Sequence, residues 1–560
     1  MKYNGAEIII KLLEEQGIDK ISGIPGGTNL PIYHALNKSY KIQHILARHE
    51  QGAGFIAQGI ARTTGKAAVC FATSGPGVTN LLTAIADAKL DSVPMVAITG
   101  QVPAALLGTD AFQEVDTCGL AIPITKHNFI VRSAKELFHV IPEAFKLAET
   151  GRPGPVVIDV PKNVQLEEIE LQEWPKKQEE IINKNMVSLQ DIEKIANMIN
   201  RAERPLLYIG GGILQSNAHD FLYQLAKKNN IPVASTLMGL GCFPADDNLY
   251  LGMLGMHGAP YTNLILNETD LLIAFGVRFD DRATGRIAAF CPNAAVLHVD
   301  IDPAELDKNK LTNFSIAADI QMVLKELLPF LQENHRQQWI SRIEEIKERH
   351  PFCMPEANAS CHPLNIIKRI SDLVDDDTII TTDVGQHQMW VAQAYPFKKP
   401  RRLLTSGGLG TMGFGLPTAI GAALANPDKK VICISGDGSF LMNIQELATL
   451  ADLNLNIKVI ILNNGGLGMV RQQQELFFQG NYIASSFITN PDFTGIATHF
   501  GIKGYALSHL DGGEGFLEEF LLAEGPCVIN IPIACSENVM PIVPPGAAND
   551  QMMIGGEQLA

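Results

Sequence analysis

The stretch VICISGDGS at 431–439 joins a short apolar run, typical of a buried strand, to a glycine-rich turn that carries Asp437. The following segment, 443–453, has the apolar periodicity of a helix, and a second apolar run at 459–462 leads into a pair of asparagines that ends with Asn464. This order predicts two parallel neighbouring strands joined by a right-handed crossover. Asp437 and Asn464 should therefore lie together at the C-terminal edge of a sheet, where ligands bind in open α/β folds.

These side chains are chemically suited to a magnesium-bound diphosphate. Mg²⁺ prefers hard oxygen ligands, few of them from the protein, and a carboxylate and an amide carbonyl both supply them. The neighbouring glycines let the backbone approach an anion closely, and a helix that begins there directs free N–H groups at it. An Asp-Gly pair also forms hairpin turns. The helix between the two strands and the paired asparagines argue against that alternative.

Further motifs are spread along the whole chain. In order they are GIPGG at 23–27, RHEQGA at 48–53, TSGPG at 73–77, GTDAFQEVD at 108–116, GRPGP at 151–155, VPK at 160–162, MLGMHG at 253–258, RFDDR at 278–282, GQHQMW at 385–390, GGLGTMG at 407–413 and LGMVRQ at 467–472. Together with the first stretch, they resemble the acetohydroxyacid synthase (acetolactate synthase large-subunit) family of thiamine diphosphate enzymes. The resemblance covers nearly the whole chain.

The resemblance implies an α/β fold with three doubly wound parallel-sheet domains. These would be an N-terminal pyrimidine-binding domain at 1–165, a central flavin-binding-like domain at 186–330 and a C-terminal domain for thiamine diphosphate and Mg²⁺ at 360–545. A length of 560 residues fits this number of domains. Two charged stretches, 166–185 and 333–356, are predicted to be connections, the second with a helical part. The first and last domains are expected to share a topology.

The activity implied by the resemblance is that of an acetolactate synthase in branched-chain amino acid biosynthesis. Pyruvate is decarboxylated on thiamine diphosphate, and the two-carbon unit is joined to a second 2-keto acid. Glu50 would hydrogen-bond the aminopyrimidine of the cofactor, Met412 would hold the cofactor in a bent shape, and Gly410 would offer its carbonyl. The structural alternatives are that Glu50 is a surface partner of Arg48 or His49, and that Met412 packs in the core.

The site residues implied by the resemblance fall into four groups. The catalytic residues are Glu50, Gln113, Lys162 and Met412. The cofactor-binding residues are Pro25, Gly26, Gly75, Gln386, His387, Gly410, Met412, Gly436, Asp437, Gly438, Ser439, Asn464, Gly466, Leu467, Gly468 and Met469. The metal ligands are Asp437, Asn464 and Gly466. The substrate-binding residues are Gly27, Phe112, Gln113, Lys162, Arg282, Met469 and Gln473.

A flavin site is expected in the central domain. The turn Gly210-Gly211-Gly212 follows an apolar run at 205–209, but it lacks the full spaced dinucleotide fingerprint. The resemblance implies flavin adenine dinucleotide (FAD) in a structural role, because the reaction is redox-neutral. The RFDDR motif favours the flavin-containing branch of the family over the flavin-free catabolic branch, and its structural alternative is a salt-bridged surface turn. The matching positions are Arg152, Gly210, Gly211, Gly212, Thr236, Leu237, Met256, His257, Gly276, Arg278, Asp300 and Ile301.

Absent and altered motifs narrow the choice of reaction. The chain has no adjacent histidines, which are typical of pyruvate decarboxylases, and Glu50 excludes a glyoxylate carboligase. Gln473 stands where biosynthetic members of the family usually have a tryptophan that packs against the extra methyl group of 2-ketobutyrate. One buried methylene contributes on the order of 1 kcal/mol. We therefore predict acetolactate as the main product and a weak preference for 2-ketobutyrate.

Charge and cysteine content limit the partners. A net charge of −16 without a Lys/Arg cluster disfavours nucleic acids and anionic membranes. Nine cysteines without a CxxC pair, and no visible signal or transit peptide, favour the cytoplasm.

The resemblance further implies an obligate homodimer with shared active sites, a tetramer in many relatives, and a small regulatory subunit in biosynthetic members. Two other functions stay open. One is a flavin-dependent enzyme that resembles pyruvate oxidase, and the other is a non-catalytic paralogue.

Overall fold

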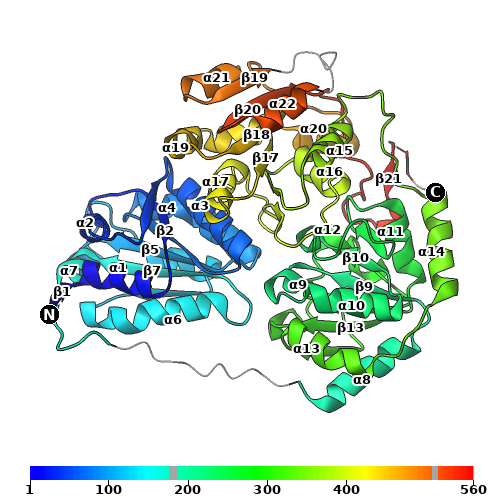
Figure 1. Cartoon of the computed structure of the whole chain (residues 1–560), viewed down its shortest axis with the longest axis horizontal. Helices are drawn as coiled ribbons and strands as arrows, with labels where there is room; N and C mark the ends of the chain where they lie inside the picture. Colours follow the sequence, from blue (N-terminus) through cyan, green and yellow to red (C-terminus); the bar gives the residue numbers. More distant parts are fainter. Residues whose placement is uncertain (176–186, 507–514, 556, 559–560) are drawn as a thin grey trace.

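Three parallel sheets organise the chain, and each is built from its own segment (Figure 1). The computed structural model describes residues 1–175, 187–506, 515–555 and 557–558. The sheets lie within the segments 1–165, 186–330 and 360–545 that the sequence predicts as domains. The part 176–185 of the first predicted connection, and residue 186, lie outside the described residues.

The first and last sheets share one topology, as the sequence predicts. The order of the N-terminal sheet is β3-β2-β4-β5-β7-β6, and that of the C-terminal sheet is β16-β15-β17-β18-β20-β19. The N-terminal strands are β2 (Lys20–Gly23), β3 (Gln43–Leu46), β4 (Ala68–Ala72), β5 (Met95–Gln101), β6 (His127–Ile130) and β7 (Pro155–Pro161). The C-terminal strands are β15 (Ile379–Thr382), β16 (Leu403–Leu404), β17 (Val431–Gly436), β18 (Ile457–Asn463), β19 (Lys503–Ala506) and β20 (Cys527–Pro532).

The central sheet has a different order, β11-β10-β9-β12-β13-β14, in which the chain starts in the middle and winds outward in both directions. This is the strand order of dinucleotide-binding folds. Its strands are β9 (Pro205–Ile209), β10 (Val233–Ser235), β11 (Tyr250–Met253), β12 (Leu271–Phe275), β13 (Ala295–Asp300) and β14 (Phe314–Ala317). Two short antiparallel pairs complete the strands: β1 (Lys2–Asn4) with β8 (Glu168–Glu170), and β21 (Met553–Ile554) with β22 (Glu557–Gln558).

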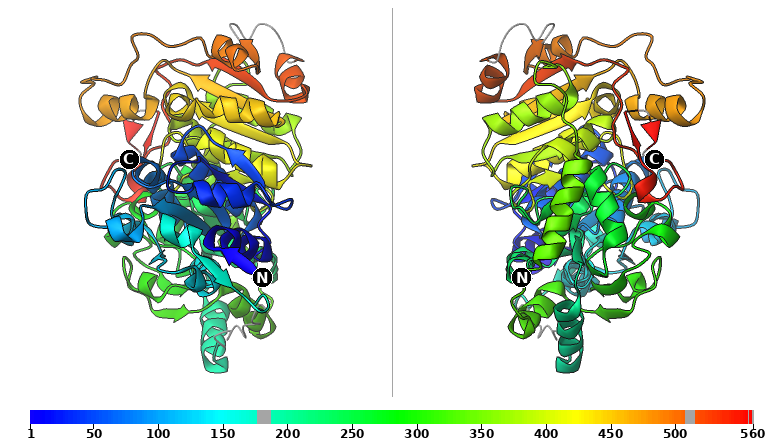
Figure 2. Two further views of the ribbon diagram at one scale, coloured as in Figure 1. Left: turned by 90° about the vertical axis from the view of Figure 1, so that its left-hand side faces the viewer. Right: turned by 90° about the vertical axis from the view of Figure 1, so that its right-hand side faces the viewer.

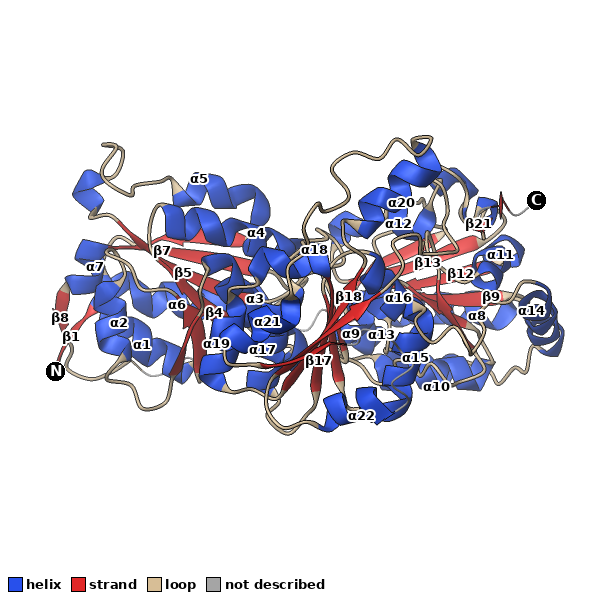
Figure 3. Cartoon of the chain, turned by 90° about the horizontal axis from the view of Figure 1, so that it is seen from above, coloured by secondary structure: helices blue, strands red, loops and turns tan. Residues whose placement is uncertain are grey.

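Helices cover the faces of these sheets, as the view from above shows (Figure 3). The N-terminal helices are α1 (Gly5–Glu15), α2 (Leu30–Leu36), α3 (Glu50–Thr64), α4 (Pro76–Leu90), α5 (Thr117–Ala121), α6 (Leu137–Glu149) and α7 (Lys162–Leu166). The central helices are α8 (Leu189–Arg201), α9 (Gly211–Gln215), α10 (His219–Asn229), α11 (Pro260–Glu268), α12 (Asp281–Thr284), α13 (Ile320–Leu327) and α14 (Gln337–Arg349). The C-terminal helices are α15 (Pro363–Leu373), α16 (Gln386–Ala394), α17 (Gly415–Ala425), α18 (Asp437–Phe440), α19 (Glu446–Leu453), α20 (Gly468–Phe477), α21 (Phe493–His499) and α22 (Gly515–Leu522).

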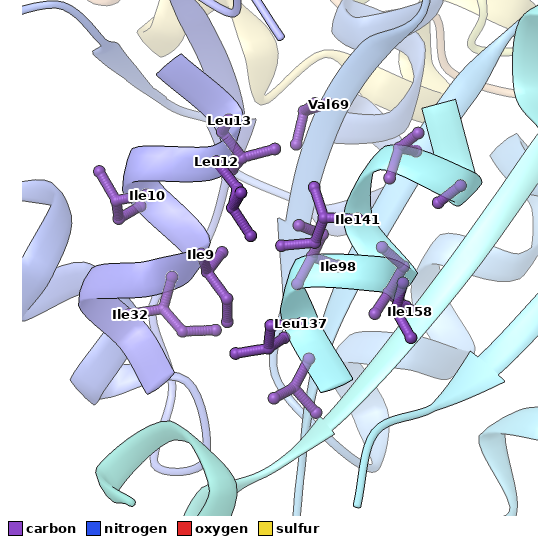
Figure 4. Close-up of a cluster of buried hydrophobic side chains, with 14 of the residues drawn as sticks. Ile9, Ile10, Leu12, Leu13, Ile32, Val69, Ile98, Leu137, Ile141 and Ile158 are labelled. Atoms are coloured by element: carbon purple, nitrogen blue, oxygen red, sulfur yellow. The ribbon is translucent and has the colours of Figure 1, made fainter. Parts of the chain in front are cut away.

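The first helix illustrates why these segments fold as they do. Asn4 caps α1 by accepting from the Glu7 N–H, and the Glu7 carboxylate accepts from the Asn4 N–H in return. The apolar stripe of α1, which includes Ile9 and Leu13, faces Ile141 of α6 and the apolar face of the sheet (Figure 4). Each fully buried side chain of this size contributes about 1.5–3 kcal/mol, so the stripe holds α1 on its sheet. No helix among the described residues is long and apolar enough to cross a membrane.

The N-terminal and C-terminal domains meet through α3 and α17, which lie side by side (Figure 1). Glycines make this approach close, because a Cβ atom on Gly59 would collide with the Thr418 carbonyl and one on Gly421 with the Ile56 carbonyl. Figure 2 shows the yellow-to-orange C-terminal domain above the other two domains. The helix contact thus fixes where the N-terminal and C-terminal domains of one chain sit relative to each other.

The second predicted connection is largely part of the central domain. Its helix α14 covers the segment 339–347 that the sequence predicts as helical, and Trp339 is buried with its Nε1 donating to the Pro205 carbonyl at 3.0 Å. The interpretation of all of 333–356 as a connection is therefore wrong for α14, because a stripe of Trp339, Ile343 and Ile346 packs on the central sheet. The chain also returns to this domain near its end, where Asn267 Nδ2 of α11 donates to Asp550 Oδ2 at 2.8 Å.

Candidate active site

The predicted crossover unit is present, and it brings Asp437 and Asn464 to one sheet edge. Strands β17 and β18 are parallel neighbours, with Gly436 opposite Leu462 at their C-terminal ends. Asp437 begins α18 directly after β17, and Asn464 follows the last residue of β18. The periodic segment between the strands forms α19, which starts three residues later than the sequence predicts.

A cavity opens at this edge and gathers most of the predicted residues of the C-terminal domain. The predicted residues that line it are Gln386, His387, Met412, Gly436, Asp437, Gly438, Ser439, Asn464, Gly466, Leu467, Gly468 and Met469. The sequence interpretation missed six further lining residues, namely Val384, Gly385, Trp390, Leu462, Val470 and Ile533. Gly385 and Trp390 belong to the quoted GQHQMW motif, which was a usable signal, whereas apolar residues such as Ile533 are indistinguishable from core residues in the sequence.

Three polar groups in the cavity suit a cation bound to a diphosphate. Asp437 is 1% exposed, and burial raises the pKa of its carboxyl, while its Oδ2 accepts from Asn490 Nδ2 at 3.0 Å. Among the described residues, Asn464 Oδ1 and His387 Nε2 are buried and have no hydrogen-bond partner. Burial lowers the pKa of His387 to about 3, so this imidazole is neutral near pH 7. A buried carboxylate beside an unpaired amide oxygen fits Mg²⁺.

Glycines keep the cavity open and its walls close. A Cβ atom on Gly468 would collide with Gln386 Oε1 and Asn464 Nδ2, and one on Gly436 would lie 2.9 Å from His387 Nδ1. No cluster of three or more His, Cys, Asp or Glu side chains in the described part of the chain could hold a metal ion. A site with one carboxylate and one amide matches the preference of Mg²⁺ for few protein ligands plus phosphate oxygens and water.

Met412 is held between two anchors. Asp383, which is buried, accepts from the Gly413 N–H at 2.8 Å and from the Gly415 N–H at 3.1 Å. On the other side, Thr411 donates its N–H to Ser406 Oγ at 2.9 Å. Gly410 has a φ of +69°, a conformation that favours glycine, and it does not line the cavity.

The predicted N-terminal residues lie at the C-terminal edge of their own sheet. Glu50 begins α3 and is 9% exposed, and its Oε2 accepts from Asn80 Nδ2 at 3.0 Å. Gly75 packs against Gln113, because a Cβ atom on Gly75 would lie 2.9 Å from the Gln113 carbonyl oxygen. Lys162 begins α7 after β7.

The remaining N-terminal residues of the prediction lie on loops at the same edge. Pro25, Gly26 and Gly27 follow β2, and Phe112 is 87% exposed in the loop after β5. The structure of one chain does not bring these residues to the cavity. Among the described residues, those that line the cavity all lie between 384 and 533.

The predicted flavin residues lie at the C-terminal edge of the central sheet. They follow β9 (Gly210, Gly211, Gly212), β10 (Thr236, Leu237), β11 (Met256, His257) and β12 (Gly276, Arg278), and they end or follow β13 (Asp300, Ile301). Asp300 is largely buried, which raises the pKa of its carboxyl to about 6. Arg152 reaches this edge from the N-terminal domain, with its Nη1 2.6 Å from Glu305 Oε1. Arg282 is exposed, and its Nη1 lies 3.6 Å from Met256 Sδ.

Comparison with known proteins agrees with this division of the chain. Three family models match, described as the N-terminal TPP binding domain (residues 3–120), the central domain (192–327) and the C-terminal TPP binding domain (383–531) of thiamine pyrophosphate enzymes. The acetolactate synthase isozyme 1 large subunit of Escherichia coli (strain K12) is 52% identical over 555 residues, which are 99% of this chain and 98% of that protein. The chain belongs to the acetolactate synthase large subunits.

Other acetolactate synthases are similar over comparable lengths. The isozyme 2 large subunit of Escherichia coli (strain K12) is 46% identical over 551 residues, which are 98% of this chain and 99% of that protein. The chloroplastic acetolactate synthase of Arabidopsis thaliana is 42% identical over 581 residues, which are 99% of this chain and 85% of that protein. Membership in this family of thiamine diphosphate enzymes, and the three-domain α/β fold expected from the resemblance, are thus confirmed.

In this acetolactate synthase large subunit, the sequence interpretation missed several polar neighbours of the predicted site residues. Asn490 contacts Asp437 from a loop that follows α20, and Asn80 contacts Glu50 from α4. Gln472, one residue before the predicted specificity residue, is fully buried behind the cavity, whereas Gln473 is exposed on α20. Asn80 follows the TSGPG motif by three residues, but Asn490 stands in no motif, so the sequence carries no signal for its contact.

Proposed function

We propose that this acetolactate synthase large subunit decarboxylates pyruvate and joins the two-carbon unit mainly to a second pyruvate. The observation that carries the proposal is the cavity at the ends of β17 and β18, where the buried Asp437 carboxylate lies beside an unpaired Asn464 oxygen. Thiamine diphosphate, when bound, supplies a nucleophilic carbon and accepts the electrons released with CO₂.

Magnesium would be held by few protein groups. The Asp437 carboxylate and Asn464 Oδ1 are the side-chain ligands, and the Gly466 carbonyl is the third ligand of the proposal. The backbone turn at Gly465, whose φ is +72°, supports the approach of residue 466 to the site. The glycines at 436, 438 and 468 leave room for the diphosphate close to the backbone.

The active site would be completed by the partner subunit of a homodimer. Glu50 lies at the edge of the N-terminal sheet, and no residue of the N-terminal domain lines the cavity of the same chain. A site shared across a two-fold axis would bring Glu50 of one protomer to the cavity of the other. We further propose that two such dimers form a tetramer, and, because relatives carry the name large subunit, that a smaller regulatory subunit binds.

In this arrangement each side chain has one task. Asn80 fixes Glu50 Oε2, so that Glu50 Oε1 is free to exchange a proton with the aminopyrimidine ring. Gln113 and Lys162 supply an amide and a cation that orient the carboxylate of the keto acid, together with Gly27, Phe112 and Arg282. Met412, fixed on both sides, supplies an apolar wall beside the cofactor.

FAD is proposed for the C-terminal edge of the central sheet. The strand order of this sheet and the buried Asp300 at the end of β13 support a dinucleotide site. The glycines after β9 and β12 lie against each other, since a Cβ atom on Gly212 would lie 2.5 Å from Gly276 Cα. The flavin would have a structural role, because condensation of two keto acids is redox-neutral.

A subunit-mixing experiment tests the shared site. Glu50→Gln and Asp437→Asn are each expected to abolish acetolactate formation from pyruvate. If sites are shared, a hybrid dimer of the two variants carries both changes in one site and none in the other, so random mixing restores about a quarter of the sites. The matched control mixes Glu50→Gln with Lys162→Met, where both sites of the hybrid carry a change and no activity returns. No recovery in the first mixture would contradict the shared site.

The second substrate is tested on the same protein. Pyruvate and 2-ketobutyrate are supplied together, and both acetohydroxy acids are quantified. Gln473→Trp is expected to raise the preference for 2-ketobutyrate about fivefold, because one methylene is worth about 1 kcal/mol. Oxygen or quinone consumption without an acetohydroxy acid would instead indicate the pyruvate oxidase-like alternative, and no reaction at all would indicate a non-catalytic paralogue.

A further inference from the structure

Gln472 has no role in the proposed reaction, yet it is fully buried directly behind the cavity. It lies on α20 and is 0% exposed. Its amide makes three hydrogen bonds. Nε2 donates to the Val539 carbonyl at 2.9 Å, while Oε1 accepts from the Val539 N–H at 2.8 Å and from Gln386 Nε2 at 2.9 Å. A side chain with this many fixed partners has one orientation.

The backbone of Val539 decides that orientation. A backbone N–H can only donate and a backbone carbonyl can only accept, so the oxygen of Gln472 must face the N–H and its nitrogen must face the carbonyl. Exchanging the two ends would oppose donor to donor and acceptor to acceptor in a buried site. The Gln472 oxygen is therefore the end that Gln386 meets.

The orientation of Gln472 in turn determines the orientation of Gln386, which lines the cavity. Its Nε2 donates to Gln472 Oε1 and to the Glu537 carbonyl at 2.8 Å, so both of its donors face acceptors. Its Oε1 then faces Asn464, and it accepts from Asn464 Nδ2 at 3.1 Å. Two backbone groups thus fix which end of Gln386 points at the metal site.

Asn464 is the last amide of this chain of contacts. Because its nitrogen is engaged by Gln386, its oxygen is the end that stays unpaired and buried among the described residues. An oxygen can bind Mg²⁺, whereas an amide nitrogen cannot. We propose that Gln472 is a positioning residue that acts through Gln386 and keeps the oxygen of Asn464 turned toward the metal, an inference that rests on the proposed magnesium site.

Two further contacts restrict this set of amides. Gly468 packs closely against them on one side, because a Cβ atom on Gly468 would collide with Gln386 Oε1 and Asn464 Nδ2. The segment that carries Val539 is itself held by two domains. The Val543 N–H donates to the Met256 carbonyl of the central domain at 2.8 Å, and Gln393 Nε2 on α16 of the C-terminal domain donates to the Met540 carbonyl at 3.1 Å. The backbone of Val539, which orients the three amides, is therefore held in place by the contacts that this segment makes with both domains.

Metal binding tests the inference without a measurement of activity. Mn²⁺ is titrated into the full-length protein with saturating thiamine diphosphate, and free Mn²⁺ is measured by electron paramagnetic resonance. Gln472→Met removes the acceptor for Gln386 and should weaken Mn²⁺ binding about tenfold, as expected for a residue that orients a ligand. Gln472→Glu keeps an oxygen for Gln386 and for the Val539 N–H, so it should stay within about threefold of the wild type. Gln224→Met, an exposed site on α10, is the matched control.

The thermal midpoint of each variant separates positioning from stability. Both Gln472 variants lose the bond to the Val539 carbonyl and should be less stable, but only Gln472→Met should lose metal affinity. A folded Gln472→Met with wild-type affinity, or a tenfold loss in Gln472→Glu, would overturn the inference. If Gln472→Met does not fold, Gln386→Met replaces it, with the same tenfold loss expected. A wild-type protein that binds no Mn²⁺ with thiamine diphosphate would instead overturn the proposed magnesium site.

Discussion

Replacement of Arg62 by methionine should destabilise the contact between the N-terminal and C-terminal domains strongly. The guanidinium is buried, with Nη2 at 3.0 Å from Asp87 Oδ1 and 2.9 Å from Asp91 Oδ2, and both carboxylate side chains are 0% exposed. Nη1 also donates to the Thr405 carbonyl of the C-terminal domain at 3.1 Å. Without Arg62, two adjacent carboxylates would be buried with no compensating charge.

The two carboxylates hold the glycine-rich loop that precedes Met412. Asp91 accepts from the N–H groups of Gly407 and Gly408 at 3.0 and 2.7 Å, and Asp87 accepts from Thr411 Oγ1 at 3.0 Å and from the Ser406 hydroxyl. Removing one partner of a buried ion pair costs about 3–5 kcal/mol. For a domain of this size, that corresponds to a fall in the thermal midpoint on the order of 10 °C.

The loss of stability caused by Arg62→Met should itself depend on pH. Burial, and then the neighbouring Asp91, raise the pKa of Asp87 to about 6, and Arg62 opposes the shift. Loss of Arg62 should raise this pKa further. A carboxyl whose pKa is higher in the folded than in the unfolded state contributes stability at low pH that is lost as the pH rises through the folded pKa. The difference between Arg62→Met and wild type should therefore be smaller at pH 5 than at pH 7.5.

Calorimetry at the two pH values is the assay. The double variant Arg62→Met with Asp87→Asn should recover part of the loss at pH 7.5, because one uncompensated charge is removed. Arg132→Met, at an exposed position, is the control and should leave the midpoint within about 1–2 °C of the wild type. An equal deficit at both pH values, or a shift as small as that of the control, would refute the electrostatic argument.

Two further predictions concern the cavity. Asn490→Ala removes a hydrogen bond that lowers the pKa of Asp437, so this pKa should rise, and Mn²⁺ binding with thiamine diphosphate should weaken more at pH 6 than at pH 8; equal weakening at both would contradict this. Gly468→Ala introduces a Cβ atom that collides with Gln386 and Asn464, and it should weaken Mn²⁺ binding about tenfold or more, whereas Gly515→Ala, in open space, should not.

Local patterns were sufficient to predict the parts of the site that neighbouring elements build. The apolar runs before Asp437 and Asn464 form adjacent parallel strands, and the helix between them lies within the periodic segment, although it begins three residues later than predicted. Here the strand-to-strand geometry follows from a chirality rule and needs no distant contact. The partners that orient these two residues, Asn490 and Gln386, come from other elements, and no pattern in the sequence connects them.

Charged residues were the harder case, because their usual place is a solvated surface. Arg62 of α3 and Asp87 of α4 are charged, yet they are buried where these two helices meet the loop of the C-terminal domain. In α14, by contrast, the sequence interpretation took a helix of the central domain for part of a connection. Its many charges suggested a connection, although Trp339 and Ile343 stand four residues apart and define the buried stripe of a helix.

The amides of the proposed metal site rest on backbone groups of a segment that also contacts the central domain. The segment from Glu537 to Val543 contacts Gln386 and Gln472 on one side and Met256 and His257 of the central domain on the other, with His257 Nδ1 3.1 Å from the Pro541 carbonyl. A shift of the central domain against this segment would move the backbone groups that orient the amides behind Asn464. The central domain can therefore support catalysis through the position of this segment, without contributing any group to the reacting atoms.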